Sequence, residues 1–171
     1  KEIDIPVEAP QRTLVDSTHD DTLALTPTVL LALHLLHLTD SITTIGNDVR
    51  ITATHDITNC HINDGSIIDG ALRLRDCTLK SIQEACVTIG IGVICQNSVI
   101  YNGSTITNSA KLKNCFVGEA CEITDGFTAE NSLFFANCYM SNGEACAAFC
   151  GPFSASHHKS SLLIGGMYSF Y

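Results

Sequence analysis

The chain is 171 residues long, which is enough for one domain with a core of its own. It contains no Trp and only 6% aromatic residues, so Ile, Val, Leu, Cys and Ala must fill that core, which suits many thin and similar layers. The formal net charge is −9, and the nine basic residues are spread along the chain. This pattern argues against nucleic-acid binding, because no Lys/Arg cluster is available to neutralise phosphates.

The N-terminal flank, residues 1–41, does not repeat. Within it, residues 26–39 predict one helix, with Thr26 as a plausible N-cap. The helix also carries His34 and His37, for which ordinary packing is favoured over a metal pair. Leucines lie almost all round it, so we expect it to be buried against the rest of the protein or a neighbouring subunit: Leu30, Leu31, Leu33, Leu35, Leu36 and Leu38.

The ends of the chain bear on its location. No signal peptide is recognisable, and the longest apolar run, residues 29–38, is too short to span a bilayer. We therefore expect a cytoplasmic protein without a membrane partner. The chain starts at Lys1 rather than Met and stops in an apolar run, so we expect it to be a piece of a longer protein.

From residue 42 to 147 the sequence repeats every 17 residues. The fourth, tenth and sixteenth positions of each block are apolar, as in Ile100, Ile106 and Leu112, and a small residue tends to stand two positions before each. One block contains four extra residues, which predict a loop at 80–88. The regular blocks are ITTIGNDVRITATHDIT (42–58), NCHINDGSIIDGALRLR (59–75), NSVIYNGSTITNSAKLK (97–113) and NCFVGEACEITDGFTAE (114–130).

This spacing predicts short strands separated by tight turns. Residues two apart lie on the same face of a strand, so each unit of about six residues points one small and one large side chain inward. Gly, Asn or Asp follows, as at Asn102-Gly103, and tolerates positive φ. Three strands and three corners close a triangular coil, and coils stack about 4.8 Å apart through parallel hydrogen bonds. We predict about six such coils; a β-sandwich, the alternative, does not usually recur at a fixed interval.

The nine cysteines fit this repeat better than a disulfide or metal framework. No C-x-x-C motif occurs, and the count is odd. Only Cys86, in the inserted loop, and Cys150, after the repeat, fall outside the inward columns. The others act as small hydrophobic residues, with a metal site as the less favoured alternative: Cys60, Cys77, Cys95, Cys115, Cys121, Cys138 and Cys146.

The pattern resembles the hexapeptide-repeat superfamily, whose ideal unit is [LIV]-G-x-x-x-x. Ile45-Gly46 and Val117-Gly118 fit this unit closely, whereas other units lack the Gly. The resemblance implies an all-β fold, a left-handed parallel β-helix over 42–147. The run NSLFFANCYMSNGEACAAFCGPFSASHHKSSLLIGGMYSF, 131–170, is similar to an uncharacterised bacterial family of long hexapeptide-repeat proteins, in which the chain continues past this end and no function is assigned.

The broader hexapeptide class supplies the functional expectations. It consists mostly of acyl- and acetyltransferases acting on sugar nucleotides, amino sugars or amino acids, with acyl-CoA or acyl carrier protein as donor. Other members are C-terminal halves of sugar-nucleotide pyrophosphorylases, non-catalytic scaffolds, or carbonic anhydrases with His ligands. Most are trimers, so the resemblance implies a homo-oligomer. No covalently bound cofactor and no metal are expected here.

Residues 148–171 predict an irregular continuation of the coil. The next large inward residue should stand at position 151, which is Gly, followed by Pro152. The segment that follows is rich in Ser and His, and a break in a regular fold is where functional residues concentrate. We therefore expect the candidate site in this segment.

The candidate catalytic base is His157 or His158, since imidazole has a pKa near neutral pH and can accept a proton from the attacking hydroxyl or amine. Because adjacent residues of a strand face opposite ways, only one of the two should point into a given cleft. Ser154, Ser156 and Lys159 are the candidate substrate-binding residues, with Lys159 placed for a phosphate or the acyl carrier.

Two further histidines belong to the repeat. His61 lies between inward residues, so it should face outward, and it is a second candidate base. His55 falls in an inward column and should be a hydrogen-bonded core residue.

The first functional prediction is an acyl- or acetyltransferase acting on a sugar nucleotide or amino sugar. The alternative is a non-catalytic scaffold or oligomerisation module of a larger protein, for example beside a nucleotidyltransferase domain. The scarcity of basic residues counts against tight binding of a polyphosphate such as coenzyme A.

Overall fold

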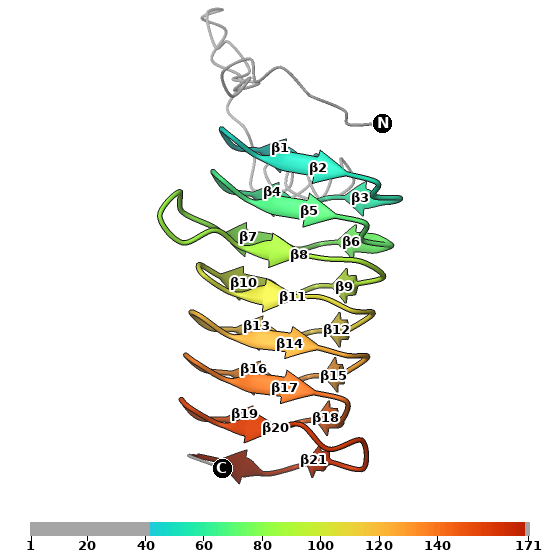
Figure 1. Ribbon diagram of the computed structural model, residues 1–171, viewed down its shortest axis with the longest axis vertical. Helices are drawn as coiled ribbons and strands as arrows, with labels where there is room; N and C mark the ends of the chain where they lie inside the picture. The colour runs from blue at the N-terminus through green and yellow to red at the C-terminus, as the bar shows by residue number, and fades with distance from the viewer. Residues whose placement is uncertain (1–41, 170–171) are drawn as a thin grey trace, which may run out of the picture.

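The computed structural model describes residues 42–169, which form a parallel β-solenoid of about seven coils (Figure 1). The repeat architecture expected from the 17-residue period is confirmed. The predicted helix at 26–39 lies outside the described residues. Within 42–169 there is no helix long and apolar enough to cross a membrane.

Three parallel sheets make the three sides of the coil. The first, sheet A, has eight strands in register one coil apart, for example Ile100 beside Val117. Its strands are β1 (Thr44–Ile45), β4 (His61–Ile62), β7 (Thr78–Lys80), β10 (Val99–Tyr101), β13 (Phe116–Val117), β16 (Leu133–Phe134), β19 (Phe149–Cys150) and β22 (Met167–Tyr168).

Sheets B and C have seven strands each. Sheet B contains β2 (Arg50–Thr52), β5 (Ile67–Asp69), β8 (Thr88–Ile89), β11 (Thr105–Ile106), β14 (Glu122–Thr124), β17 (Tyr139–Ser141) and β20 (Ala155–Ser156). Sheet C contains β3 (Ile57–Thr58), β6 (Arg73–Arg75), β9 (Ile94–Gln96), β12 (Lys111–Lys113), β15 (Thr128–Glu130), β18 (Glu144–Cys146) and β21 (Leu162–Ile164).

The core is the stack of large inward residues that the period predicted. Each has nearly the same neighbours above and below, so one aliphatic residue packs on the next and no bulky centre is needed. Phe127 stands two positions before Ala129, at an inward position where a small residue was expected; its ring contacts Phe134 edge-on, with centroids 6.0 Å apart. The fully buried members include Ile62, Ile68, Leu74, Leu79, Ile89, Ile100, Ile106, Leu112, Ile123 and Met140.

The small inward residues satisfy backbone groups at the corners, where the strand ladders stop. The Ser104 hydroxyl donates to the Gly118 carbonyl at 2.6 Å and accepts from the Cys121 amide at 3.1 Å. The Cys115 thiol donates in the same way to the Lys113 carbonyl at 3.2 Å. Ser and Cys can replace each other in these columns because both are small and both can donate to a carbonyl at a corner, such as that of Lys113, which also accepts from the Asn131 amide at 3.0 Å.

The Asn residues that open the repeat blocks make the corner between sheets C and A. Asn97, Asn114 and Asn131 have φ of 45°, 54° and 51°, a left-handed conformation that Asn tolerates better than most residues. Their side chains form a ladder, in which Asn97 Nδ2 donates to Asn114 Oδ1, and Asn114 Nδ2 to Asn131 Oδ1, each at 2.9 Å. The left-handed φ favours Asn at this corner, although Ala147 takes the equivalent position one coil further on with a φ of 51°.

The coil does not end near residue 147, and this raises the number of coils from the predicted six to about seven. Ala129 pairs with Ala145, and Ala145 with Leu163, which are spacings of 16 and 18 residues in place of 17. One residue is missing at the corner after β17, and the corner after β20 is longer. The segment is irregular in coil length, and its strands stay in the ladder.

This shift corrects two cysteine assignments. Cys146 was predicted to point inward, but Ala145 takes that place and Cys146 is half-buried. Cys150 was placed outside the columns, but it pairs with Phe134 and is fully buried. Both errors follow from extending a strict 17-residue count through a coil of 16.

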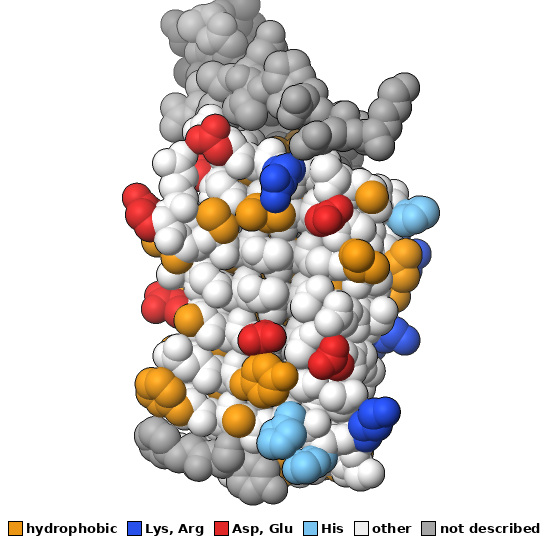
Figure 2. All heavy atoms as spheres, in the orientation of Figure 1, with side chains coloured by type: hydrophobic (Ala, Val, Ile, Leu, Met, Phe, Trp, Pro, Cys, Tyr) orange, Lys and Arg blue, Asp and Glu red, His pale blue; other side chains and the backbone are white. Residues whose placement is uncertain are grey.

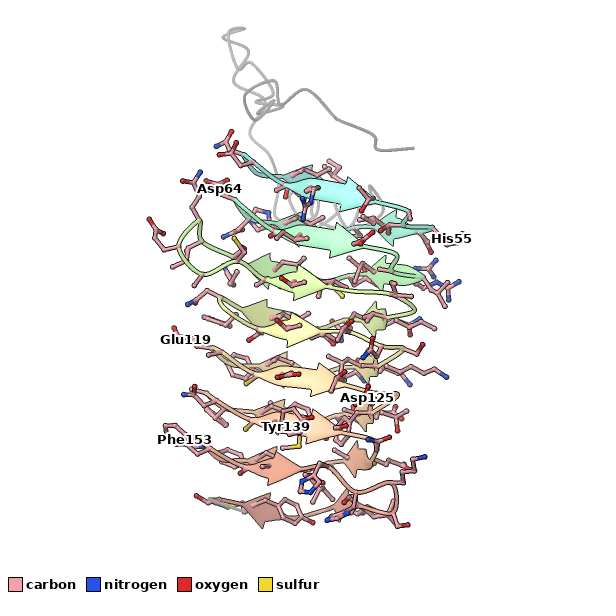
Figure 3. All side chains as sticks on the ribbon, in the orientation of Figure 1. His55, Asp64, Glu119, Asp125, Tyr139 and Phe153 are labelled. Carbon is pink, nitrogen blue, oxygen red and sulfur yellow. The ribbon has the colours of Figure 1, made fainter. Side chains whose placement is uncertain are left out.

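His55 was predicted to point into the core, and this is wrong: its side chain is exposed at a corner (Figure 3). In the next coil Ala71, three positions before Leu74, is buried, and Leu72 is exposed. The inward small residue of the early coils therefore stands three positions, not two, before the large one, and His55 takes the outward place of Leu72.

Candidate functional site

Three regions of the surface are candidate sites: the corner loop after β20, the cleft beside the inserted loop, and the outer face of sheet A. The first two carry histidines that the sequence singled out. The third carries aromatic side chains in an unbroken row. Figure 2 shows the face formed by sheet B, on which acidic side chains are scattered and two adjacent His side chains lie near the C-terminal end.

The corner loop between β20 and β21 carries His157, His158 and Lys159, and all three are exposed. The Ser161 amide donates to the His158 carbonyl at 3.0 Å, which closes the loop as a turn. The two imidazole rings lie beside each other, with centroids 4.3 Å apart and planes at 35°. The expectation that they would face opposite ways is wrong, because both residues follow β20 in a corner loop and are not part of a strand.

The two candidate serines point into the coil, whereas these histidines are at the surface. Ser154 is buried, and its hydroxyl donates to the Gly151 carbonyl at 2.8 Å. Ser156 is buried beneath Met140, and its hydroxyl has no hydrogen-bond partner among the described residues. The structure therefore brings together the two histidines and the lysine at the surface, and places both serines in the interior.

A cleft of about 570 Å³ lies between the first corner and the inserted loop, at the N-terminal end of the described coil. Its lining includes His61, which faces outward as predicted and whose Nδ1 contacts the Thr44 hydroxyl. Asp64 and Glu84 line it as well. Gln83 Nε2 donates to Asp48 Oδ2 at 2.7 Å, which ties the inserted loop to the first corner.

The volume of this cleft falls in the range of small-molecule sites. Sequence reasoning missed Asp64 and Glu84; the four-residue insertion was the signal that marked this corner. In the described part of the chain, no three His, Cys, Asp or Glu side chains gather closely enough to hold a metal ion.

Several core cysteines have shifted pKa values, but their thiols are buried away from solvent. A hydrogen bond from Cys77 lowers the pKa of Cys60 to about 7, and the same contact together with burial raises the pKa of Cys77. Burial raises the pKa of Cys150 to about 12. All three side chains are almost fully buried, so they cannot reach a substrate at the surface, and they serve as core residues.

The outer face of sheet A carries four aromatic side chains on four successive coils, here called the aromatic ladder: Tyr101, Phe116, Phe135 and Phe149. Successive ring centroids are 5.3, 5.7 and 4.8 Å apart, so the row is continuous. Tyr101, Phe116 and Phe135 are half-buried, and Phe149 is exposed. The sequence carried a signal that was not used, namely apolar residues recurring at the outward positions of one side.

The outer face of sheet A also lacks acidic groups. The strands β1, β4, β7, β10, β13, β16, β19 and β22 contain no Asp or Glu, in a chain that has 18 of them. The charged or titratable side chains of these strands are His61 and Lys80, apart from the Tyr hydroxyls and the inward Cys150 thiol. Aromatic enrichment together with charge depletion is typical of the centre of a protein–protein contact.

These features define a parallel β-solenoid repeat protein, with regular inward columns and one apolar outer side. Residues 19–171 match the family described as "Domain of unknown function (DUF4954)". The match covers most of the chain, so the chain belongs to this family. Comparisons with curated proteins and with solved structures found no match.

Proposed function

We propose that the domain is a non-catalytic assembly module, in which copies of the chain associate through the outer face of sheet A. The observation that carries the proposal is the aromatic ladder. Four rings in continuous contact stand on an outer face whose strands have no acidic residue. Large aromatic side chains contribute much of the energy of protein contacts, because each covers a large apolar area at small entropic cost.

Charge makes this face the side on which a second copy of the chain can bind. Each copy carries a net charge of −9, so two copies repel each other wherever carboxylates come opposite carboxylates. The strands of sheets B and C present outward acids such as Glu122, Glu130 and Glu144. Sheet A is the side on which two copies can meet without opposing carboxylates from their strands.

The size of the face is adequate for such a contact. Eight strands at about 4.8 Å give a height of roughly 38 Å, and one side of a coil at about 3.3 Å per residue is roughly 18 Å wide. The flat area is therefore about 700 Å² per copy, close to the roughly 800 Å² per partner of a standard stable interface.

The test is sedimentation velocity on the full chain over a series of concentrations. Phe149→Asp places a carboxylate at the C-terminal end of the aromatic ladder. Leu162→Asp is the matched control, since it adds the same charge to a more exposed apolar residue on sheet C. We expect a dimer or trimer for the wild type and for Leu162→Asp, and a monomer for Phe149→Asp.

Two results would overturn the assembly proposal. One is a wild-type chain that stays monomeric at every concentration. The other is an oligomer that both substitutions leave intact, or that both abolish equally. Circular dichroism of each variant checks that the coil is folded, and the exposure of both sites makes this the expected result.

We also infer a left-handed coil and a relation to hexapeptide-repeat proteins. The Ile45-Gly46 and Val117-Gly118 units support the relation. The strands of sheet B run from left to right at the front of Figure 1 while the chain descends, and this path supports a left-handed coil. An experimental map that shows a right-handed coil would remove both inferences.

A second candidate function is acyl transfer, favoured by the adjacent imidazoles of His157 and His158 beside Lys159. One imidazole would accept the proton of a sugar hydroxyl or amine as that group attacks the thioester carbonyl, and the carrier thiol would leave. The donor would be acyl-CoA or acyl carrier protein, and the acceptor a sugar nucleotide or amino sugar. Lys159 would bind a phosphate of the donor or acceptor.

Turnover of these donors and acceptors by the full chain tests the second candidate. Acyl transfer that is lost in His157→Ala or His158→Ala, but kept in the matched corner variant His55→Ala, would support it. Absence of transfer with both donor classes, or transfer that survives the double substitution of the two histidines, would rule it out for this corner.

A further inference from the structure

In the first coil, apolar side chains are partly exposed at inward positions that are buried in the next coil. Ile45 is 38% exposed, and Ile51 and Ile57 are half-buried. Their partners one coil further on, Ile62, Ile68 and Leu74, are buried. Among residues 42–169, no layer lies above the inward side chains of the first coil, so this end of the described coil is apolar.

An uncovered apolar end makes a solenoid prone to end-to-end association. It presents apolar side chains together with the outermost strands β1, β2 and β3, on which a further strand could pair. Repeat proteins need a terminal element that covers the last apolar layer. Otherwise the end of one coil is free to stack on the end of another.

The sequence immediately upstream has the composition of a cover. The predicted helix, residues 26–39, carries six leucines and ends three residues before Ile42, where the described coil begins. The family match starts at residue 19 and so includes this segment in the same domain as the coil. A helix of 14 residues is about 21 Å long and about 10 Å wide, and one side of the coil is roughly 18 Å wide.

We propose that residues 26–39 lie across the N-terminal end of the coil and cover Ile45, Ile51 and Ile57. The segment completes the core of the first coil and prevents end-to-end stacking. The inference does not depend on the assembly proposal, because it concerns the end of the coil and not its side.

The chain contains no Trp, which allows a direct test. Leu35→Trp in the full chain introduces one reporter in the proposed cover, and we expect blue-shifted fluorescence, as for a buried indole. Adding Ile45→Asp at the end of the coil should shift the emission to the red. Ile164→Asp is the matched control on the last coil and should leave the emission unchanged. Phe149→Asp is present throughout, so that contacts through sheet A do not contribute.

Several results would overturn the proposal. The emission of Leu35→Trp could be that of an exposed indole, or it could stay unchanged on addition of Ile45→Asp. It could also respond to Phe116→Asp and not to Ile45→Asp, which would place the segment on sheet A.

Hydrogen exchange gives a second, independent measurement on the full chain. With Leu35→Asp, amides of residues 44–58 should exchange at least several-fold faster, while those of residues 105–130 keep their rates, since only the first coil loses its cover. Equal exchange of residues 44–58 in the variant and the wild type would contradict the proposal even if the fluorescence data were ambiguous.

Discussion

The outer faces of sheets A and C stand on the same coils, yet they present different chemistry. On sheet A the outward positions hold the aromatic ladder. On sheet C they hold ion pairs, such as Arg73 Nε to Asp56 Oδ2 at 3.1 Å and Lys113 Nζ to Glu130 Oε1 at 2.7 Å. The inward side chains of the two sheets are alike. The inward columns therefore fix the coil, and each outer face is free to carry its own surface chemistry.

The comparison is tested most strongly at two adjacent residues, Phe134 at the end of β16 and Phe135 directly after it. Phe134 points inward and is fully buried, whereas Phe135 points outward into the aromatic ladder. We expect Phe134→Ala to lower the free energy of unfolding by about 3–5 kcal/mol, and Phe135→Ala by at most about 1.5 kcal/mol, the scale of an aromatic pair. Urea denaturation measures both. Equal losses would show that inner and outer faces are not independent.

The next largest loss of stability is expected at the corner that joins sheet C to sheet A. Asn114→Ala retains a left-handed φ of 54° that Ala disfavours by about 1–2 kcal/mol, and it removes both ladder hydrogen bonds. Asn114→Gly removes the same hydrogen bonds without the backbone strain. We expect Ala to lower the thermal midpoint more than Gly does. A larger loss for Asn114→Gly than for Asn114→Ala would show that backbone strain is not what selects Asn at this corner.

A smaller effect is expected at the corner between sheets B and C, and only in acid. Hydrogen bonds from Asn108 and then Ser141 hold the pKa of Asp125 below its usual value. A depressed folded pKa stabilises the protein above the unfolded pKa, and this contribution is lost as the pH falls through the folded value. Between about pH 5 and pH 3 the thermal midpoint of the wild type should therefore fall more steeply than that of Asp125→Asn. Parallel pH profiles would contradict this assignment.

The smallest effect belongs to the charged face of sheet C. Lys113 and Glu130 form a close ion pair, but both side chains are about half exposed. Exposed pairs gain little over their hydration, and salt screens them. We expect Lys113→Gln to leave both the thermal midpoint and the sedimentation of the protein unchanged. A change in the oligomer would show that sheet C, and not sheet A, carries the association.

The candidate site was less predictable than the coil. His61 was correctly placed on the outside, because its neighbours Cys60 and Ile62 point inward. His157 and His158 were treated as strand residues, and the structure places them in a turn at a lengthened corner. Corner length is set by how neighbouring coils pack, for instance where the Phe127 ring lies against Gly143 of the next coil. A count along one chain does not reveal such a contact.

The sequence by itself determined the coil, because a column of inward residues recurs every 17 positions and most residues with a left-handed φ are Gly, Asn or Asp, with exceptions such as Ala120 and Ala147. These requirements are local and recur once per coil, so the spacing of residues in the sequence reveals them. Only the tertiary structure decided which outward residues become neighbours. Tyr101, Phe116, Phe135 and Phe149 are 14 to 19 residues apart in sequence, and they form one surface because the coils stack their rings 4.8 to 5.7 Å apart.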